Sequence, residues 1–178
     1  MTESSHISVR NLSVHFVLGR QLFGKPPVVR AVDEVSLEIP KGSFFGLVGE
    51  SGSGKTTLGR AILRAAPITS GQILYRDDEV EYDLGNIAKE QLKDYRRRAQ
   101  LIFQDPYAAL SPRMTVRDII AEPLEVMGIT NTRAETDDRV REIASKCRLN
   151  LEHLRRFPHA FSGGQRQRIS IARALVCN

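Results

Sequence analysis

The sequence predicts an α/β fold with a β-rich N-terminal region, a strand–loop–helix core and an inserted helical lobe. Apolar residues that alternate with polar ones near the N-terminus are typical of antiparallel strands. They are Ile7, Val9, Leu12, Val14 and Phe16 in one segment and Val35, Leu37 and Ile39 in the other. An unbroken apolar run over residues 44–48 predicts a strand buried on both faces, as in a parallel sheet. From residue 106 to about 160 the candidate elements are all helices, which indicates a helical lobe.

Glycines and prolines mark the connections between these elements. Residues 17–27 hold two glycines and two prolines and are expected to form a loop. Apolar residues with helical spacing predict a helix from Leu58 to Ala65, stopped by Pro67. A second short apolar run over residues 101–103 ends at Gln104.

Three prolines are expected to break the helical lobe into segments, and they are Pro112, Pro123 and Pro158. One segment begins at Thr115, with Asp118 three residues later as a plausible cap. Another carries four apolar residues on one face, and they are Val140, Ile143, Ala144 and Cys147.

The composition is that of an ordinary folded protein. Of 178 residues, 41% are hydrophobic and 26% charged, which excludes disorder for most of the chain. No apolar run reaches the ~18 residues of a membrane span, and the N-terminus lacks a secretory pattern. Cys147 and Cys177 lack metal-site spacing and favour a reducing, cytosolic compartment.

The net charge of +5 permits anionic partners without selecting one. The densest basic cluster, Lys93 with Arg96, Arg97 and Arg98, lies in a helical stretch. A solvated helical face explains it better than nucleic-acid binding, and we expect no nucleic-acid partner.

A glycine-rich segment after the run at 44–48 has the pattern G-x-x-x-x-G-K-[ST]. The candidate nucleotide-binding residues are Gly49, Glu50, Ser51, Gly52, Ser53, Gly54, Lys55, Thr56 and Thr57. Backbone N–H groups of such a loop, with the following helix N-terminus, form an anion site. Lys55 would neutralise the β and γ phosphates, and the Thr56 hydroxyl would be a ligand of Mg²⁺. The alternative is a merely flexible glycine turn, which the position between strand and helix disfavours.

A second motif runs from Phe161 to Arg168, with the sequence FSGGQRQR. Ser162 and Gln165 fit a capping box that opens a helix with Ile169, Ala172, Leu175 and Val176 as apolar residues. A cap alone does not require Gly163 and Gly164 in the first turn, because each glycine lowers helix stability. Bare N–H groups at a helix N-terminus suggest close approach to an anion.

This motif resembles the LSGGQ signature of ABC ATPases, with Phe161 in place of the usual Leu. The resemblance implies ATP as the nucleotide and a second ATPase subunit, since the signature closes on the γ-phosphate of ATP held by the opposing subunit. It gives Ser162 and Gly164 a catalytic role beside Lys55. It also identifies Gln104 as the family's Q-loop glutamine, which reaches the metal and attacking water. Phe16 corresponds to the aromatic ring that stacks on adenine, although a core Phe is the alternative.

The sequence around the motifs resembles that of the ATP-binding subunits of bacterial oligopeptide and dipeptide transporters over nearly the whole chain. The matching segments are GESGSGKTT, QDPYAALSPRMTVRDIIAEPL and RFPHAFSGGQRQRISIARAL, with LFGKPP in the loop at 17–27. The implied partners are a like or unlike second ATPase subunit, transmembrane permease subunits and, indirectly, a solute-binding protein. The implied location is the cytoplasmic face of the plasma membrane.

The family follows the signature helix with a strand ending in Asp-Glu, which this sequence does not reach. Asp77, Asp78 and Glu79 offer no substitute, because Arg76 interrupts the apolar run before them. The resemblance therefore implies a partial nucleotide-binding domain with an incomplete parallel sheet. Residues 1–103 would hold the core and β subdomain, and residues 104–178 the Q-loop and helical subdomain. We expect no meaningful hydrolysis by the 178-residue chain alone, because the carboxylates for the metal and water are missing.

Three alternatives remain beside peptide import. Relatives that import nickel, glutathione or other small solutes share much of this sequence. A soluble ABC ATPase acting on DNA or the ribosome would carry a coiled-coil insertion or a tandem cassette, neither of which is seen. The third alternative is a hydrolysis-incompetent fragment.

Overall fold

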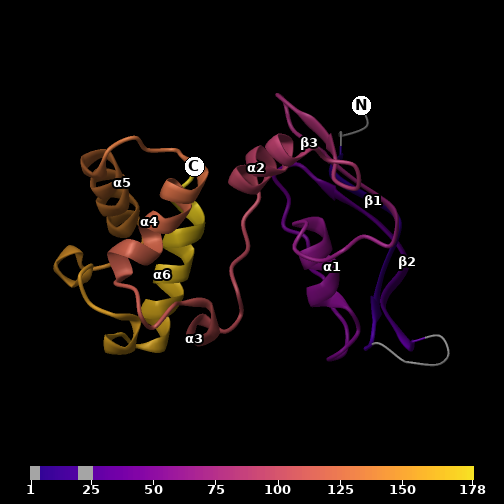
Figure 1. Ribbon diagram of the computed structural model, residues 1–178, viewed down its shortest axis with the longest axis horizontal. Helices are drawn as coiled ribbons and strands as arrows, with labels where there is room; N and C mark the ends of the chain where they lie inside the picture. Colours follow the sequence, from indigo (N-terminus) through magenta and orange to yellow (C-terminus); the bar gives the residue numbers. More distant parts are fainter. Residues whose placement is uncertain (1–4, 20–25) are drawn as a thin grey trace. The chain divides into compact units, whose positions relative to one another are not determined.

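The structure is a computed structural model that describes residues 5–19 and 26–178 (Figure 1). The chain divides into two compact units, one up to Leu92 and the other from Lys93. The first contains a sheet and the helix α1, and the second is helical. The boundary falls inside helix α2 (Lys89–Arg98), ahead of the division after residue 103 that the sequence suggested.

The first unit is built on a four-stranded antiparallel sheet in the order β2-β1-β3-β4. The strands are β1 (Ser5–Val17), β2 (Val28–Pro40), β3 (Ser70–Arg76) and β4 (Glu81–Asp83). Cross-strand pairs such as Val9 with Leu37 confirm the predicted N-terminal strand pair. Val9, Leu12 and Val14 of β1 are buried, with the strand register shifted between Val9 and Leu12, and their apolar burial stabilises the sheet.

The helix α1 (Lys55–Ile62) belongs to the first unit and confirms the predicted helix after the glycine loop. Leu58 and Ala61 are its buried residues, which matches the helical spacing of the apolar positions. A turn at Asp77 joins β3 to β4, with the Asp77 amide donating to the Val80 carbonyl at 3.0 Å. The acidic residues after β3 therefore lie in a hairpin turn, as predicted.

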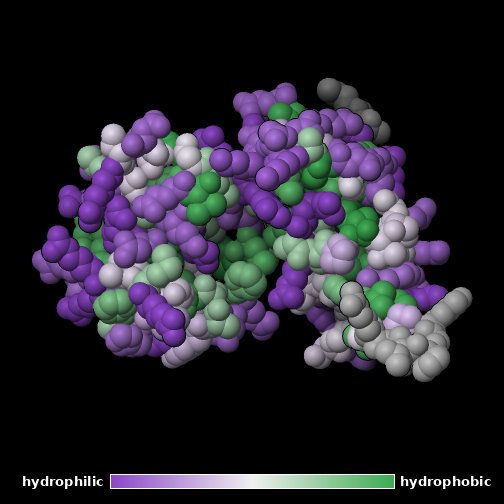
Figure 2. Space-filling view, viewed as in Figure 1, coloured by the Kyte–Doolittle hydropathy of each residue, from purple (hydrophilic) through white to green (hydrophobic). Residues whose placement is uncertain are grey.

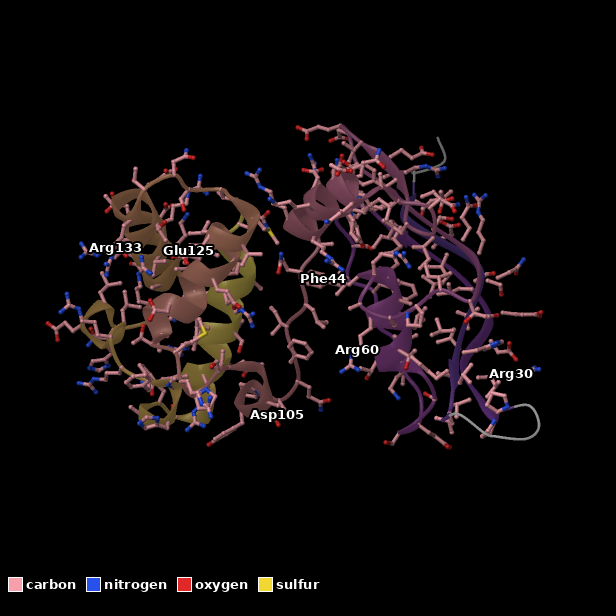
Figure 3. All side chains as sticks on the ribbon, in the orientation of Figure 1. Arg30, Phe44, Arg60, Asp105, Glu125 and Arg133 are labelled. Carbon is pink, nitrogen blue, oxygen red and sulfur yellow. The ribbon has the colours of Figure 1, made fainter. Side chains whose placement is uncertain are left out.

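The expected strand over residues 44–48 is absent, and this prediction was wrong. These residues carry no strand, and Phe44 (Figure 3) and Val48 are almost fully exposed. Residues 101–103, the second short run, also form no strand and are exposed. A strand persists where its backbone groups pair with a neighbour, and no segment in the described ranges pairs with either run. Apolar sequence alone therefore does not produce a strand here.

The second unit packs four helices, with the short η1 (Leu151–His153) and η2 (Pro158–Ala160) between them (Figure 1). The helices are α3 (Pro106–Ala109), α4 (Val116–Met127), α5 (Arg133–Lys146) and α6 (Gly163–Leu175). Their shared core includes Ile120, Leu124, Val140, Ala144 and Ile169, all fully buried. The predicted apolar face of α5 is confirmed, because Val140 and Ala144 are in this core and Ile143 and Cys147 pack against it.

Caps set the helix boundaries in this unit. The Thr115 side chain accepts from the Asp118 amide at 3.2 Å and begins α4, as predicted. Pro123 lies inside α4, so the expectation that it breaks a helix was wrong. Proline in a helix interior costs about 3 kcal/mol, and the buried side chains of Ile119, Ile120 and Leu124 offset that cost.

The basic cluster on α2 is open to solvent. Lys93, Arg96 and Arg97 are exposed on α2, which confirms a solvated helical face. Figure 2 shows hydrophilic side chains spread over the visible face of each unit, with apolar side chains interspersed among them. Residues 20–25 of the loop expected at 17–27 lie outside the described residues. No helix in the ranges 5–19 and 26–178 is long and apolar enough to cross a membrane.

Candidate functional site

The glycine-rich segment from Gly49 to Gly54 leads directly into the first turn of α1. Gly54 is the N-cap residue of α1, and no side chain caps the helix. The first turn also carries no acidic residue. The backbone N–H groups at this end therefore keep their capacity to bind an anion, and the helix dipole adds positive charge there.

Gly54 has a conformation that only glycine fits. Its φ is +89°, and a Cβ at this position would lie 2.1 Å from the Ala31 carbonyl oxygen on β2. The loop can therefore approach β2 closely only because this side chain is absent. Gly52 also has a positive φ, +84°, but a Cβ there would meet nothing within 4 Å.

Gly54→Ala is expected to lower the free energy of unfolding of the full-length protein by about 2 kcal/mol or more. Alanine at positive φ costs roughly 1–2 kcal/mol, and the overlap with Ala31 adds to it. Gly52→Ala is the matched control and should lose only the cost of its φ. Denaturant unfolding of both variants tests the contact, and equal losses would show that Ala31 imposes no constraint.

Lys55 curls back over the loop. Its Nζ donates to the Gly49 carbonyl at 2.8 Å, to the Glu50 carbonyl and to Ser53 Oγ at 3.2 Å. The ammonium is thereby held against the loop whose N–H groups the sequence predicts to bind an anion. The Lys55 ammonium and the backbone N–H groups at the start of α1 therefore belong to the same loop. A polyphosphate requires this combination of positive charge and hydrogen-bond donors.

A cavity of about 310 Å³ borders the loop on the β2 side. Its lining includes Ala31, Asp33, Leu47, Gly54 and Lys55. The Asp33 carboxylate lies 3.3 Å from His15 Nε2 and 3.4 Å from Arg30 Nη1. The hydrogen bond from His15, with help from Arg30, lowers the pKa of Asp33, so this carboxylate stays ionised at neutral pH.

Phe16 does not line this cavity. It lies on β1 opposite Val29 and is 37% exposed, so it is not a fully buried core residue. Stacking of its ring on adenine stays a prediction.

The second glycine motif opens α6 as the sequence indicated. Ser162 Oγ accepts from the Gln165 amide at 3.4 Å, and Gln165 Oε1 accepts from the Ser162 amide at 2.9 Å. The predicted capping box is confirmed. Phe161 and Ile169 are buried beneath this helix start, whereas residues 162–165 are exposed.

Gly163 and Gly164 are not required by the local fold. A Cβ at either position would meet nothing within 4 Å, and neither has a positive φ. The two glycines therefore leave a patch of bare backbone on the surface at a helix N-terminus. This arrangement suits close approach of an anionic group from outside the chain.

Gln104 lies in the exposed segment just before α3. The Asp105 side chain caps α3 by accepting from the Tyr107 amide at 2.8 Å (Figure 3). Gln104 is thus the last residue before an ordered turn, with its side chain exposed to solvent.

The structure brings together two residues to which sequence reasoning assigned no role. The Arg166 guanidinium carbon lies 3.7 Å from the ring centroid of Tyr107. Arg166 also donates to the Phe161 carbonyl from Nε at 2.8 Å and from Nη2 at 2.7 Å. No local pattern relates α3 to α6, so only the tertiary structure could reveal this contact.

The described residues contain no group of three or more His, Cys, Asp or Glu arranged to hold a metal ion. The oxygen donors proposed for Mg²⁺, the Thr56 hydroxyl and the Gln104 amide, are both exposed and are of the type that this cation prefers.

An antiparallel sheet, a phosphate-type loop opening α1 and a glycine pair opening α6 define the nucleotide-binding part of an ATP-binding cassette. The family described as "ABC transporter" matches residues 32–178. This chain therefore belongs to the ABC transporter family, and its fold class is the one that the sequence predicted.

Named relatives cover nearly all of the chain. It is 47% identical over 99% of its length to the oligopeptide transport ATP-binding protein OppF of Bacillus subtilis. It is 49% identical, again over 99%, to the dipeptide transport ATP-binding protein DppF of Lactococcus lactis. In both comparisons it covers 54% of the relative, so the chain spans about half the length of these proteins.

Solved cassettes share the fold. The ATP-binding cassette MJ0796, in a dimeric post-hydrolysis state bound to ADP and phosphate, superposes with a TM-score of 0.77 at 26% identity. That comparison covers 97% of this chain and 70% of the other. A second dimeric structure of MJ0796 gives a TM-score of 0.76 at 27% identity.

Proposed function

We propose that the full-length protein is the ATP-hydrolysing, energy-coupling subunit of an importer for oligopeptides or dipeptides. The observation that carries this proposal is the loop at Gly49–Thr57, where an uncapped helix N-terminus and the Lys55 ammonium share one place. The names of the relatives at 47% and 49% identity support the peptide substrate.

In this proposal the loop residues bind the ATP phosphates. The N–H groups of Gly52, Gly54 and the first turn of α1 hold the β and γ phosphates, with Lys55 as the point charge. Glu50, Ser51, Ser53 and Thr57 complete the loop, and Phe16 stacks on adenine. Thr56 and Gln104 would hold Mg²⁺, which would neutralise charge on the phosphates.

Ser162, Gly163, Gly164 and Gln165 act on ATP held by a second subunit. Residues 162–165 are exposed, and a Cβ at Gly163 or Gly164 would meet nothing within 4 Å, so this backbone is open to a group from outside the helical unit. The dimeric state of the MJ0796 cassette supports such a pairing. The subunits would sandwich ATP, and closure would drive permease subunits at the cytoplasmic face of the membrane. Residues 1–103 and 104–178 would serve as core and helical subdomain of one nucleotide-binding domain.

Growth on peptides tests the proposal. A bacterial strain that lacks peptide import and needs one amino acid should grow on a dipeptide of that amino acid when the full-length gene and its permease genes are supplied. The Lys55→Ala variant should not support growth. Restored uptake of nickel or glutathione in place of the dipeptide would redirect the substrate class and overturn peptide import.

Gly164→Ala should separate stability from activity. Since a Cβ at this position meets nothing, alanine is expected to raise the free energy of unfolding by about 0.5 kcal/mol through helix propensity. ATP hydrolysis should fall, because the added methyl group occupies the surface that the partner's phosphate approaches. Thermal unfolding and phosphate release on one protein preparation measure both effects. Full activity in the more stable variant would mean that bare backbone at Gly164 is not needed.

A further inference from the structure

The cation–π contact between Tyr107 and Arg166 joins two segments that the proposed function uses for different ATP molecules. Tyr107 lies in α3, which begins directly after Gln104. Arg166 lies in the first turns of α6, which begins after Ser162. In a paired cassette, Gln104 would serve the ATP of its own subunit, and Ser162 would serve that of the partner.

Arg166 is fixed from two sides. Its Nε and Nη2 donate to the Phe161 carbonyl at 2.8 and 2.7 Å, one residue before the Ser162 cap. Its guanidinium carbon lies over the Tyr107 ring, 3.7 Å from the ring centroid. An arginine held by two donated hydrogen bonds loses little further freedom when it packs on a ring.

Tyr107 is fixed in turn by its own helix. The Asp105 side chain accepts from the Tyr107 amide at 2.8 Å, which sets the start of α3 immediately after Gln104. The far end of α3 has a second tether to α6, because Arg173 Nη1 donates to the Ala109 carbonyl at 3.4 Å. Arg173 Nη2 is itself paired with Glu122 Oε2 at 2.7 Å.

We propose that Tyr107 and Arg166 are positioning residues that hold the start of the signature helix in register with the Q-loop segment. Through this contact, a shift of the segment after Gln104 is transmitted to the backbone at Ser162. The inference rests on the proposed function, since it assigns the two segments to two ATP sites. The two segments are coupled through direct contacts, which run from the Tyr107 ring through the Arg166 guanidinium to the Phe161 carbonyl.

The test uses ATP hydrolysis by the full-length protein in its assembled transporter. The free energy of an exposed cation–π contact, if lost from the transition state, converts to about a threefold change in rate. Tyr107→Leu should therefore lower kcat about threefold. The ATP dissociation constant should change by less than about twofold, because Tyr107 lies outside the phosphate loop. Tyr107→Phe keeps the ring face and should restore kcat.

A double-mutant cycle separates positioning from general damage. Arg166→Met should lower kcat more than Tyr107→Leu, since it also removes the hydrogen bonds to the Phe161 carbonyl. In the Arg166→Met background, Tyr107→Leu should have almost no further effect. Lys146→Met is the matched control in the same helical unit, because Lys146 lies on α5 and donates instead to Glu142 Oε1 at 2.6 Å. It should leave kcat near the parental value.

Three outcomes would overturn the inference. They are an unchanged kcat in Tyr107→Leu, an equal loss from Tyr107→Leu in both backgrounds, and a Tyr107→Phe variant as slow as Tyr107→Leu. Lys55→Ala, measured in parallel, distinguishes this failure from failure of the proposed function. If hydrolysis does not depend on Lys55, the assignment of the ATP site itself is wrong.

Discussion

Replacing Lys55 by alanine in the full-length protein is expected to weaken ATP binding at least about 100-fold. The Nζ donates to three oxygen atoms of the loop, which keeps its positive charge at the proposed phosphate site. Two charge-assisted hydrogen bonds to phosphate oxygens, each worth about 1.5–3 kcal/mol, correspond to a loss of this size. Titration calorimetry with Mg·ATP measures it.

Lys41→Ala is the matched control for this measurement. Lys41 also belongs to the first unit, but its Nζ pairs with Asp78 and not with the loop. Its removal should leave the ATP dissociation constant unchanged within twofold. If Lys55→Ala bound ATP as tightly as Lys41→Ala, the loop would not be the phosphate site.

Ser162→Arg and Gly164→Asp are expected to spare ATP binding and lower hydrolysis more than about 100-fold. Both residues are exposed at the start of α6, and Gly164 has open space at its Cβ position, so the helical unit should still fold. Bulk or negative charge there would collide with the γ-phosphate of the partner subunit. Loss of preorganised donors at a developing charge has effects of this order. ATP binding by calorimetry and phosphate release by the assembled transporter are the two readouts.

Ser145→Arg provides the control for added bulk and charge, because Ser145 is exposed on α5. This variant should hydrolyse ATP at the parental rate. Parental hydrolysis by Ser162→Arg as well would rule out the role of the signature across a dimer.

Elements that follow from a local pattern of residue types were predictable from the sequence. The pair β1 and β2, the helix α1 and the caps at Thr115 and Ser162 all formed as expected. In each case the stabilising contacts lie within a few residues or follow from a simple period of apolar positions. The order of the two glycine motifs likewise predicted the family.

Elements that depend on a distant partner were not predictable in the same way. The apolar run at 44–48 has the composition of a buried strand, yet no described segment pairs with it and Phe44 is exposed. Pro123 carries a helix-breaking signal, yet the packing of Ile120 and Leu124 in the helical core keeps α4 continuous. In the first case the tertiary partner that a strand needs was missing, and in the second case tertiary packing outweighed the local preference.

The sequence by itself determined the class of site, because each motif is a run of consecutive residues. These motifs are the glycine-rich loop at Gly49–Thr57 and the glycine pair at 163–164. Only the tertiary structure showed that Gly54 must be glycine, because a Cβ there would collide with the Ala31 carbonyl oxygen. It also showed that folding does not require glycine at position 164, where a Cβ would meet nothing. It also placed Arg166 against Tyr107. Such contacts join residues far apart in the chain, and a local pattern carries no information about which of them the packing will bring within van der Waals distance.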